Sequence, residues 1–423
     1  MTTSPTDDEL QNALTQLKAT NPTLGILKLH AKLRADHPDW TVSEKRTRKI
    51  LALLNPPQKP DPAKPYPSSR LVDGLNIAQW TDRVDVRVFD ERKGKGLVAT
   101  QKIKAGETIW VEDPFVIAPE WEIYDKQRAG EACTHCTTLF ASPADARARC
   151  PSAGCPAAFC NLLCRKRALA TTHPLLCPAQ NPASMPLLRW VRSREWMALN
   201  ALTQCTARLL IANAAGDEQL AADWAVMRGF AVLGMEERAK YSFRSQPDHE
   251  TWKTAFDLFC TTFHRSGHED AKKKLTEEER KTAAILKKRL PPEIEAALFD
   301  YNTGFLQGLG RMSLNLEAHG GLYTLHAHLN HSCAPNTSVR HLDQRRALAR
   351  ITVRALADIK PGQELCITYV DPSAGYARRR TELEEWGFVC GCERCAEEGK
   401  DWKPSADEGG DLASELKAGL GVL

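Results

Sequence analysis

The feature of this sequence that most restricts its fold is a run of seven cysteines and one histidine between residues 133 and 177. The eight residues are Cys133, Cys136, Cys150, Cys155, Cys160, Cys164, His173 and Cys177. Two tetrahedral zinc ions require eight such thiol and imidazole ligands, and closed four-ligand sites leave no position for a catalytic water. We therefore expect two structural zinc ions that hold together a segment too small to fold by packing alone. Buried cysteines without metal are the alternative, but two short Cys pairs and a His-x3-Cys spacing seldom coincide by chance.

A second cysteine cluster lies near the end of the sequence, at Cys390, Cys392 and Cys395. It supplies three metal ligands, so a fourth ligand must come from elsewhere in the chain. Three further cysteines stand singly among apolar residues and are expected to be small buried hydrophobic residues without chemistry. These are Cys205, Cys260 and Cys366.

Composition restricts the class of protein and its compartment. With 423 residues the chain is longer than one hydrophobic core usually serves, so we expect two to four structural units. The sequence contains no run near the roughly 18 apolar residues of a membrane span. Its first residues lack the basic-then-apolar pattern of a secretory signal, which predicts nucleus and/or cytoplasm and disfavours disulfides. The net charge of +4 is too small to indicate a general nucleic-acid binder.

The N-terminal part has helical spacing of apolar residues over 7–54, which predicts a small helical unit within residues 1–56. Its basic segment 43–49 begins with a plausible helix cap and has two interpretations, a weak nucleic-acid contact or a solvated helix face. A proline-rich linker is expected over 57–70 and a short acidic tail over 398–423.

Alternating segments typical of strands occupy 84–89 and 108–111, and they return at 347–353 and 364–369. A cysteine-rich segment and a stretch with helical spacing separate the two pairs, so we expect one β unit split by two insertions. The charged block 268–288 is expected to be the solvated face of a helix. The predicted order is a first β part, the cysteine segment, a helical insertion, a second β part and a final cysteine segment, over 71–130, 131–180, 181–300, 301–375 and 376–397.

The first cysteine cluster resembles the MYND zinc finger, in which the ligand pairs interleave. The resemblance implies that one zinc ion is bound by Cys133, Cys136, Cys160 and Cys164. It implies that the other is bound by Cys150, Cys155, His173 and Cys177. This sequence departs from the family pattern in having four residues between Cys150 and Cys155 instead of the usual two.

Three further motifs resemble the SET domain of protein lysine methyltransferases: Leu329-Asn-His-Ser-Cys-Ala-Pro-Asn336, Gly362-Gln-Glu-Leu-Cys-Ile-Thr-Tyr369 and Gly94-Lys-Gly-Leu97. A MYND finger between the first glycine motif and Asn330 is similar to the SMYD family. The segment 306–315 and the N-terminal helical unit look closer to fungal SET-and-MYND histone methyltransferases. The resemblance covers about residues 80–397 and implies an α+β multidomain fold, in which the finger and a helical insertion split a SET-type β fold that ends in a post-SET cysteine segment.

The resemblance also implies a pocket for S-adenosylmethionine and a third zinc ion. The pocket would be lined by the backbone of a glycine-rich loop, by an asparagine and a histidine that engage the amino-acid and adenine ends, by a further asparagine and by an aromatic platform. The matching residues are Gly94, Lys95, Gly96, Leu97, Asn330, His331, Asn315 and Phe388. Cys333 would join Cys390, Cys392 and Cys395 around the third structural zinc.

Tyr369 matches the catalytic-site tyrosine of the family, which is also counted among the cofactor-binding residues. Methyl transfer depends chiefly on positioning, because a sulfonium is already a strong electrophile. The acceptor lysine, whose ordinary pKa is about 10.4, must lose a proton, and a narrow apolar channel beside a cation favours that loss. We expect the Tyr369 hydroxyl to orient the amine or the methyl group, without acting as the base.

The resemblance predicts a histone lysine N-methyltransferase, with the tail of histone H4 favoured as substrate. The alternative is a non-catalytic transcriptional adaptor whose finger binds proline-containing peptides, because a fold does not guarantee its activity. Nucleic-acid contact by residues 7–54 would complement either function.

Overall fold

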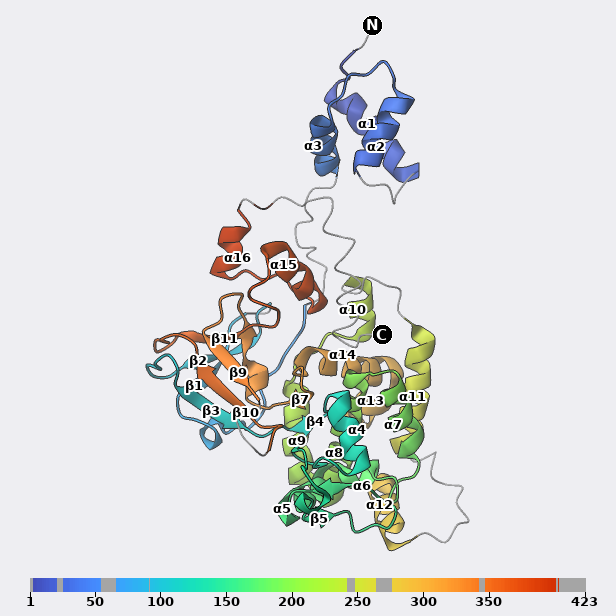
Figure 1. Ribbon diagram of the computed structural model, residues 1–423, viewed down its shortest axis with the longest axis vertical. Coiled ribbons are helices and arrows are strands. Elements are labelled where there is room, and N and C mark those ends of the chain that lie inside the picture. The colour runs from blue at the N-terminus through green and yellow to red at the C-terminus, as the bar shows by residue number, and fades with distance from the viewer. Residues whose placement is uncertain are drawn as a thin grey trace. The chain divides into compact units, whose positions relative to one another are not determined.

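The computed structural model describes residues 3–20, 26–54, 66–90, 92–241, 248–263, 276–341, 347–400 and 402 (Figure 1). Within these residues the chain divides into two compact units, residues 3–54 and residues 66–402. No helix in the described part of the chain is long and apolar enough to cross a membrane.

The N-terminal unit is a three-helix bundle with its own small core, which confirms the predicted helices. The helices are α1 (Asp7–Thr20), α2 (Ile26–Asp36) and α3 (Glu44–Leu54). The buried apolar residues are Leu10, Leu14, Leu17, Leu29, Leu33, Val42, Ile50 and Leu51. Ser43 caps α3 by accepting a hydrogen bond from the Arg46 backbone N–H at 3.2 Å. Arg46 itself donates to Asp7 (2.6 Å) and to the Pro5 carbonyl (2.7 Å), so this basic side chain is held inside the unit.

The larger unit contains a four-stranded and a three-stranded sheet, which share one core. The first has the order β1 (Val84–Val88), β2 (Lys95–Ala99), β11 (Glu364–Ile367) and β8 (Asn330–His331). The second has the order β3 (Thr108–Glu112), β10 (Ile351–Ala355) and β9 (Thr337–Arg340). Strands that precede the finger therefore pair directly with strands that follow the helical insertion. The core that the two sheets share includes Leu97, Trp110, Leu325, Val353 and Leu365. Short ladders join β4 (Val116–Ile117) to β7 (Gly321–Leu322) and β5 (Ala148–Arg149) to β6 (Ala158–Phe159).

The strands confirm three of the four predicted β segments, and the fourth is shifted. The prediction began at Ala347, whereas β10 begins at Ile351. Residues 347–350 form a turn, in which Ala347 has a φ of 58° and its carbonyl accepts from the Arg350 N–H at 2.8 Å. Alternation of apolar and polar residues is equally compatible with such a turn, so the strand predicted from this pattern began four residues too early.

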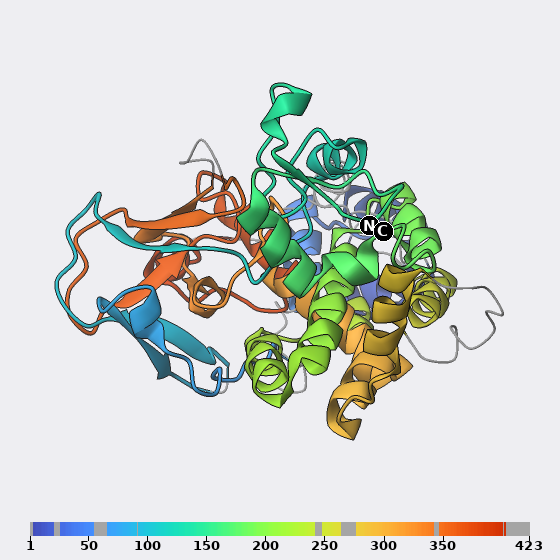
Figure 2. The same cartoon turned by 90° about the horizontal axis from the view of Figure 1, so that it is seen from below.

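Most helices of this unit gather to one side of the sheets, whereas α15 (Tyr376–Glu385) and α16 (Glu393–Glu398) lie close to β11, as Figures 1 and 2 show. Between the finger and the second β part they are α7 (Ser184–Ser193), α8 (Met197–Ala215), α9 (Asp217–Gly229), α10 (Met235–Tyr241), α11 (His249–Phe263), α12 (Glu277–Lys287), α13 (Pro292–Phe299), a π-helical turn (Tyr301–Phe305) and α14 (Leu306–Asn315). The remaining helices are α4 (Trp121–Ala129), α5 (Leu162–Thr171), α6 (His173–Leu176), α15 (Tyr376–Glu385), α16 (Glu393–Glu398) and short 3-10 turns at Ile77–Gln79, Pro143–Asp145 and His326–His328.

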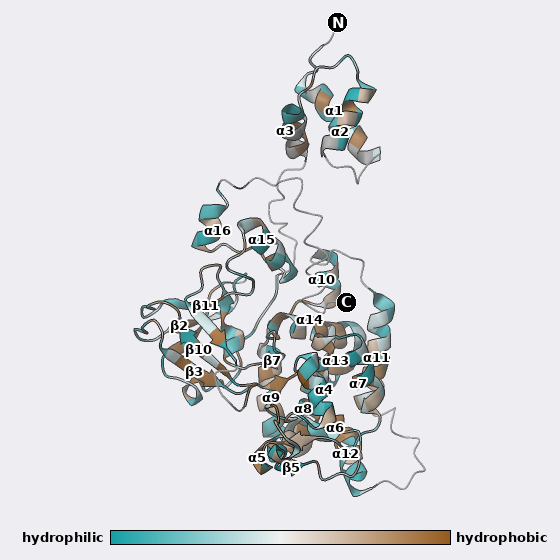
Figure 3. Ribbon diagram, viewed as in Figure 1, coloured by the Kyte–Doolittle hydropathy of each residue, from teal (hydrophilic) through white to brown (hydrophobic). Residues whose placement is uncertain are grey.

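Helix α8 is buried along almost its whole length and forms the centre of the helical core. Most other helices carry both hydrophobic and hydrophilic residues in Figure 3, as expected for amphipathic helices at a surface. In α12, Thr282 and Leu286 face inward while Glu277 and Lys281 form an exposed ion pair. This part of the charged block therefore has the predicted solvated face, and residues 268–275 of that prediction lie outside the described residues.

Candidate active site and zinc centres

The finger brings its eight predicted ligands together in the two groups that the MYND resemblance implies. In each group all four ligand atoms lie within 4.8 Å of one another. The Sγ atoms of Cys136 and Cys160 are 3.6 Å apart, and Cys155 Sγ is 3.6 Å from His173 Nε2. Tetrahedral zinc–thiolate bonds of about 2.3 Å place neighbouring ligands about 3.8 Å apart. Both groups therefore have the donor chemistry and the spacing of a structural zinc site.

Local structure explains how the finger positions its ligands. Asn161 caps α5 by accepting from the Cys164 N–H at 2.9 Å, which places Cys164 beside Cys160. The long spacer between Cys150 and Cys155 folds as a turn, in which Gly154 adopts a φ of 82° and the Cys155 N–H donates to the Ser152 carbonyl. The spacer that departs from the family pattern therefore still delivers both cysteines to the second group.

Removing zinc is expected to unfold the finger while sparing the helical core around α8. The finger's buried cluster contains only Cys133, Ala148, Ala157, Phe159 and Ala168, which is far too little apolar area to replace the metal. Structural zinc contributes roughly 10–16 kcal/mol to comparable fingers. Hydrogen exchange after chelation should show lost protection over 133–177 and unchanged protection in α8. Unchanged protection in the finger would contradict the zinc assignment.

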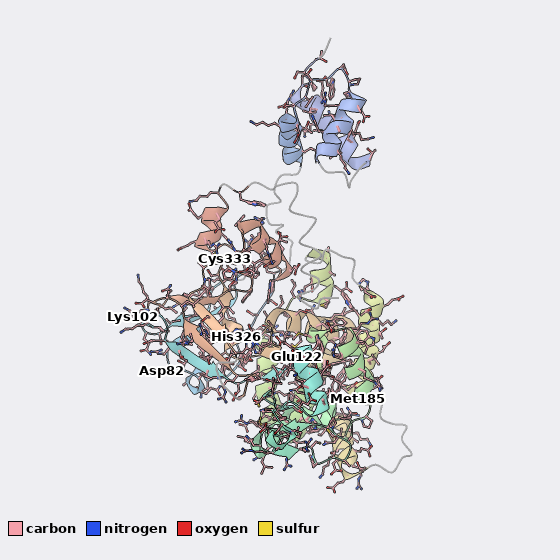
Figure 4. The ribbon with its side chains drawn as sticks, viewed as in Figure 1. Asp82, Lys102, Glu122, Met185, His326 and Cys333 are labelled. Atoms are coloured by element: carbon pink, nitrogen blue, oxygen red, sulfur yellow. The ribbon has the colours of Figure 1, made fainter. Side chains whose placement is uncertain are left out.

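The third cysteine group joins Cys333, which follows β8, to Cys390, Cys392 and Cys395. Cys333 Sγ lies 3.4 Å from Cys395 Sγ, and the labelled Cys333 lies beside α15 and α16 in Figure 4. The Arg379 guanidinium is fully buried next to this group, and its Nε atom has no hydrogen-bond partner among the described residues. Burying a cation is costly unless enough negative charge lies beside it, and its carboxylate partner, Glu398, is 35% exposed. A zinc ion with four thiolates is a dianion, so the residues present fit the metal.

The glycine-rich loop, Asn330 and Glu364 form one close-packed group. Asn330 Nδ2 donates to the Lys95 carbonyl and to Glu364 Oε1, both at 2.9 Å. Gly96 lies directly against them: a Cβ there would be 2.7 Å from Asn330 Nδ2 and 2.9 Å from Glu364 Oε1. Gly94 adopts a φ of 68° in the preceding turn. The structure thus brings the loop and Asn330 together through β2, β11 and β8, which are neighbouring strands.

Lys95 and Asn315 have side chains engaged by the protein backbone. Lys95 Nζ donates to the Gly229 carbonyl at 2.5 Å, and burial together with Arg311 lowers the pKa of this amine to about 7. Asn315 donates to the Ala231 carbonyl (2.8 Å) and accepts from the Ala231 N–H (3.1 Å). Both side chains therefore hold the segment after α9. The cofactor contacts of Asn315 and of the Lys95 backbone stay predictions.

Tyr369 stands at the centre of an aromatic group. Its hydroxyl donates to the Leu329 carbonyl at 2.7 Å. Its ring lies 4.7 Å from Trp386, 5.3 Å from His331 and 6.2 Å from Phe388, measured between centroids. Burial raises the pKa of Tyr369, so its hydroxyl keeps its proton at neutral pH. Trp386 was not predicted; its place two residues before Phe388, in a Trp-Gly-Phe segment that leads to Cys390, was the available signal.

The His331 ring connects Tyr369 to the third cysteine group. Its Nδ1 accepts from the Tyr369 backbone N–H at 3.0 Å, so the ring proton of the neutral form is on Nε2. Nε2 lies 3.2 Å from Cys333 Sγ and can donate to that thiolate. Burial, with Arg379, lowers the pKa of His331 to about 4, so the neutral form is the one present at pH 7. The side chain thus has a structural role beside the predicted cofactor contact.

Comparison with known proteins decides the family. The sequence of residues 94–370 matches the SET domain. The chain belongs to the SET-domain family. Three similar proteins are the histone-lysine N-methyltransferase SET5 of Mycosarcoma maydis, that of Yarrowia lipolytica and the protein-lysine N-trimethyltransferase SMYD5 of Homo sapiens. Their identities are 32%, 30% and 25%, over 73%, 96% and 77% of this chain. The chain spans 66% of the Mycosarcoma protein's length, just under two thirds, and 86% and 89% of the other two.

This SET-domain membership and the mixed α+β architecture confirm the family and fold class predicted from the motifs. The structure also gives a role to the last residue of the NHSCAPN motif. In this SET domain the asparagine at the end of the NHSCAPN motif, Asn336, donates to the Glu364 carbonyl at 2.7 Å and accepts from the Cys366 N–H at 2.8 Å. The motif thereby fixes the parallel pairing of β8 with β11, which aligns Asn330 with Cys366 and His331 with Ile367.

Glu112 supports the turn that precedes strand β8 in the SET domain. This buried carboxylate accepts from the N–H groups of Leu325 (2.8 Å) and His326 (3.0 Å), at the start of the turn that leads to Asn330. His326 is labelled in Figure 4. Burial raises the pKa of Glu112 to about 7 from an ordinary value of 4.5. The folded SET domain therefore holds this proton more tightly than the unfolded chain does.

We expect a measurable pH dependence from Glu112. The stability that its proton provides is complete below pH 4.5 and is lost as the pH rises through 7, by roughly 3 kcal/mol in total. The unfolding free energy of Glu112→Gln should not fall in this way as the pH rises. The difference in unfolding free energy between wild type and the variant should therefore become smaller between pH 5 and pH 8. Glu122→Gln, which changes an exposed carboxylate, should follow the wild-type profile. Parallel profiles for Glu112→Gln and wild type would contradict the assignment.

Proposed function

We propose that this SET-domain protein is an S-adenosylmethionine-dependent protein lysine N-methyltransferase that acts on histone tails in the nucleus, with histone H4 as the favoured substrate. One observation supports it most: the glycine loop, Asn330 and Tyr369 meet at three neighbouring strands, with aromatic rings packed around the tyrosine ring. The printed names of the SET5 relatives support histone lysine as acceptor. The H4 preference rests on the resemblance to fungal relatives.

Each residue has a distinct task in this proposal. Bound S-adenosylmethionine supplies a methyl group on a cationic sulfur. Gly96 leaves room for Asn330 and Glu364 to pack against the loop backbone, and Asn330 holds that backbone in place for the ligand. Phe388 offers an apolar face to a flat base. These contacts fix the methyl group relative to Tyr369, which is the main requirement for a transfer without acid–base chemistry.

The acceptor amine must be neutral before its nitrogen lone pair can form a bond to the methyl carbon as the carbon–sulfur bond breaks. The rings of Trp386, Phe388 and His331 surround Tyr369 and disfavour water there, which lowers the pKa of an ammonium. The Tyr369 hydroxyl donates a hydrogen bond to the Leu329 carbonyl, so its oxygen lone pairs remain to accept a hydrogen bond from the amine. The tyrosine therefore orients the nucleophile and takes no proton from it.

The test combines calorimetry with label transfer. Wild-type protein should bind S-adenosylmethionine, and Asn330→Ala should bind it at least about 10-fold more weakly because the loop loses its anchor. With radiolabelled cofactor and each core histone separately, wild type should label H4 most strongly. Cofactor binding with label on another histone would overturn the H4 preference alone. No binding and no label would favour the peptide-binding adaptor.

A further inference from the structure

Arg379 is a fully buried arginine, and its surroundings contain too little negative charge for a cation in such a position. Its side chain has 0% exposure on α15. Nη2 donates to Glu398 Oε2 at 2.5 Å and Nη1 donates to the Ala374 carbonyl. Glu398 is itself 35% exposed and is shared with Arg394, whose Nε donates to it at 2.7 Å. The partly exposed carboxylate of Glu398 is therefore shared by Arg379 and Arg394.

The thiolates of the third cysteine group can supply the additional negative charge that the buried guanidinium requires. The Arg379 guanidinium is hydrogen-bonded to the thiols of Cys333 and Cys395 as well as to Glu398. Both thiols are themselves buried, with exposures of 1% and 7%. Four thiolates around one zinc ion carry a net charge of −2, which is costly to bury without a nearby cation. The two buried charges therefore stabilise each other.

Arg394 has a different task. Its Nη1 donates to the backbone carbonyls of Cys333 (3.1 Å) and Pro372 (2.6 Å), so it fixes the loop and leaves the sulfur atoms to Arg379. Arg379 is thus the arginine in the described chain whose guanidinium is buried directly against this thiol group.

We propose that Arg379 is the counter-ion of the third zinc centre and sets the zinc affinity of that centre. This positioning role rests on the zinc occupancy that the proposed function includes. It also links the metal to the catalytic site. Helix α15 carries Arg379 and leads directly into Trp386 and Phe388, whose rings pack near Tyr369, while Cys333 contacts His331. A weaker third zinc centre therefore loosens the wall of the catalytic site.

The test measures zinc, with the full-length protein and without reference to methylation. Wild type should contain three zinc ions by elemental mass spectrometry. In Arg379→Met, zinc should pass from the third site to a chromogenic chelator about 10- to 100-fold faster, which is the usual effect of losing an outer-shell partner. Arg379→Lys should lie between the two, because lysine keeps the charge but not the planar fork. A Cys390→Ser background, which removes a ligand of the third site, should abolish the effect of Arg379→Met.

Two matched variants separate this role from a simple ion pair. Arg378→Met removes an exposed arginine one position away and should release zinc at the wild-type rate. Glu398→Gln removes the carboxylate partner and should retain the third zinc, because the guanidinium still faces the thiolates. Equal zinc loss in Glu398→Gln and Arg379→Met would overturn the proposal, since the ion pair alone would then explain both.

Other outcomes are equally decisive. Three zinc ions released at the wild-type rate in Arg379→Met would overturn the proposal, as would only two zinc ions in wild type. If Arg379→Met misfolds and loses all three ions, Arg379→Lys provides the test. Faster zinc release than wild type would support the proposal, and release at the wild-type rate would overturn it. Wild type that transfers no methyl group, beside the expected zinc pattern in the variants, would remove the proposed function and leave the role of Arg379 standing.

Discussion

Replacing Gly96 by alanine is expected to abolish measurable cofactor binding. The added Cβ would lie 2.6 Å from Phe89 Cε2, 2.7 Å from Asn330 Nδ2 and 2.9 Å from Glu364 Oε1. Asn330 and Glu364 are hydrogen-bonded to each other and the Phe89 ring is half-buried, so the loop or Asn330 must move. Calorimetry should show S-adenosylmethionine affinity reduced at least about 100-fold, which corresponds to about 2.8 kcal/mol.

The control for this change is Gly375→Ala. Gly375 precedes α15 with a φ of −63°, which alanine adopts readily, and no atom lies within 4 Å of the added Cβ. This variant should bind the cofactor as wild type does. Unchanged affinity in Gly96→Ala would show that the ligand does not approach this loop, and the cofactor pocket would have to lie elsewhere.

Replacing Tyr369 by phenylalanine is expected to leave cofactor affinity within about 3-fold of wild type while reducing kcat by roughly 100- to 1,000-fold. The ring packing with Trp386 and Phe388 is retained, but the oxygen that orients the amine is lost. Single-turnover transfer of labelled methyl groups at saturating cofactor measures the effect directly.

Tyr376→Phe is the matched control, since this tyrosine is also in the C-terminal part but its hydroxyl accepts a hydrogen bond from Arg380 at 3.4 Å and does not contact Leu329. It should transfer methyl groups at the wild-type rate. If Tyr369→Phe kept the wild-type kcat, the hydroxyl would have no part in the transfer step. If it instead lost cofactor affinity with kcat unchanged, the residue would belong to the binding pocket alone.

The metal ligands could be predicted from the sequence because zinc requires particular residue types in sets of four. Cys333 lies 57 positions before Cys390, and only the family resemblance joined it to the C-terminal cluster. The structure explains that joining by the parallel pairing of β8 with β11, after which Tyr369 leads the chain into α15 and back toward Cys333. Spacing alone could not supply it.

The supporting residues could not be predicted in this way. Arg379 is the second arginine in an Arg-Arg-Arg run on a charged helix, and its burial depends on the rotation of α15 against the cysteine group. Glu112 resembles any other strand-end carboxylate until the turn at His326 is folded onto it. Lys95 and Asn315 match family positions, yet their side chains hold the segment after α9, which local sequence does not place near them.

Site-resolved mass spectrometry of histone H4, after incubation with the zinc-loaded protein and S-adenosylmethionine, tests the proposed activity most directly. The proposal predicts one or more methyl groups on a lysine side chain of the H4 tail with wild type, and strongly reduced methylation with Tyr369→Phe at the same time point. Cofactor binding with no methyl-lysine on H4 or on any other core histone would contradict histone lysine methylation as the function of this site.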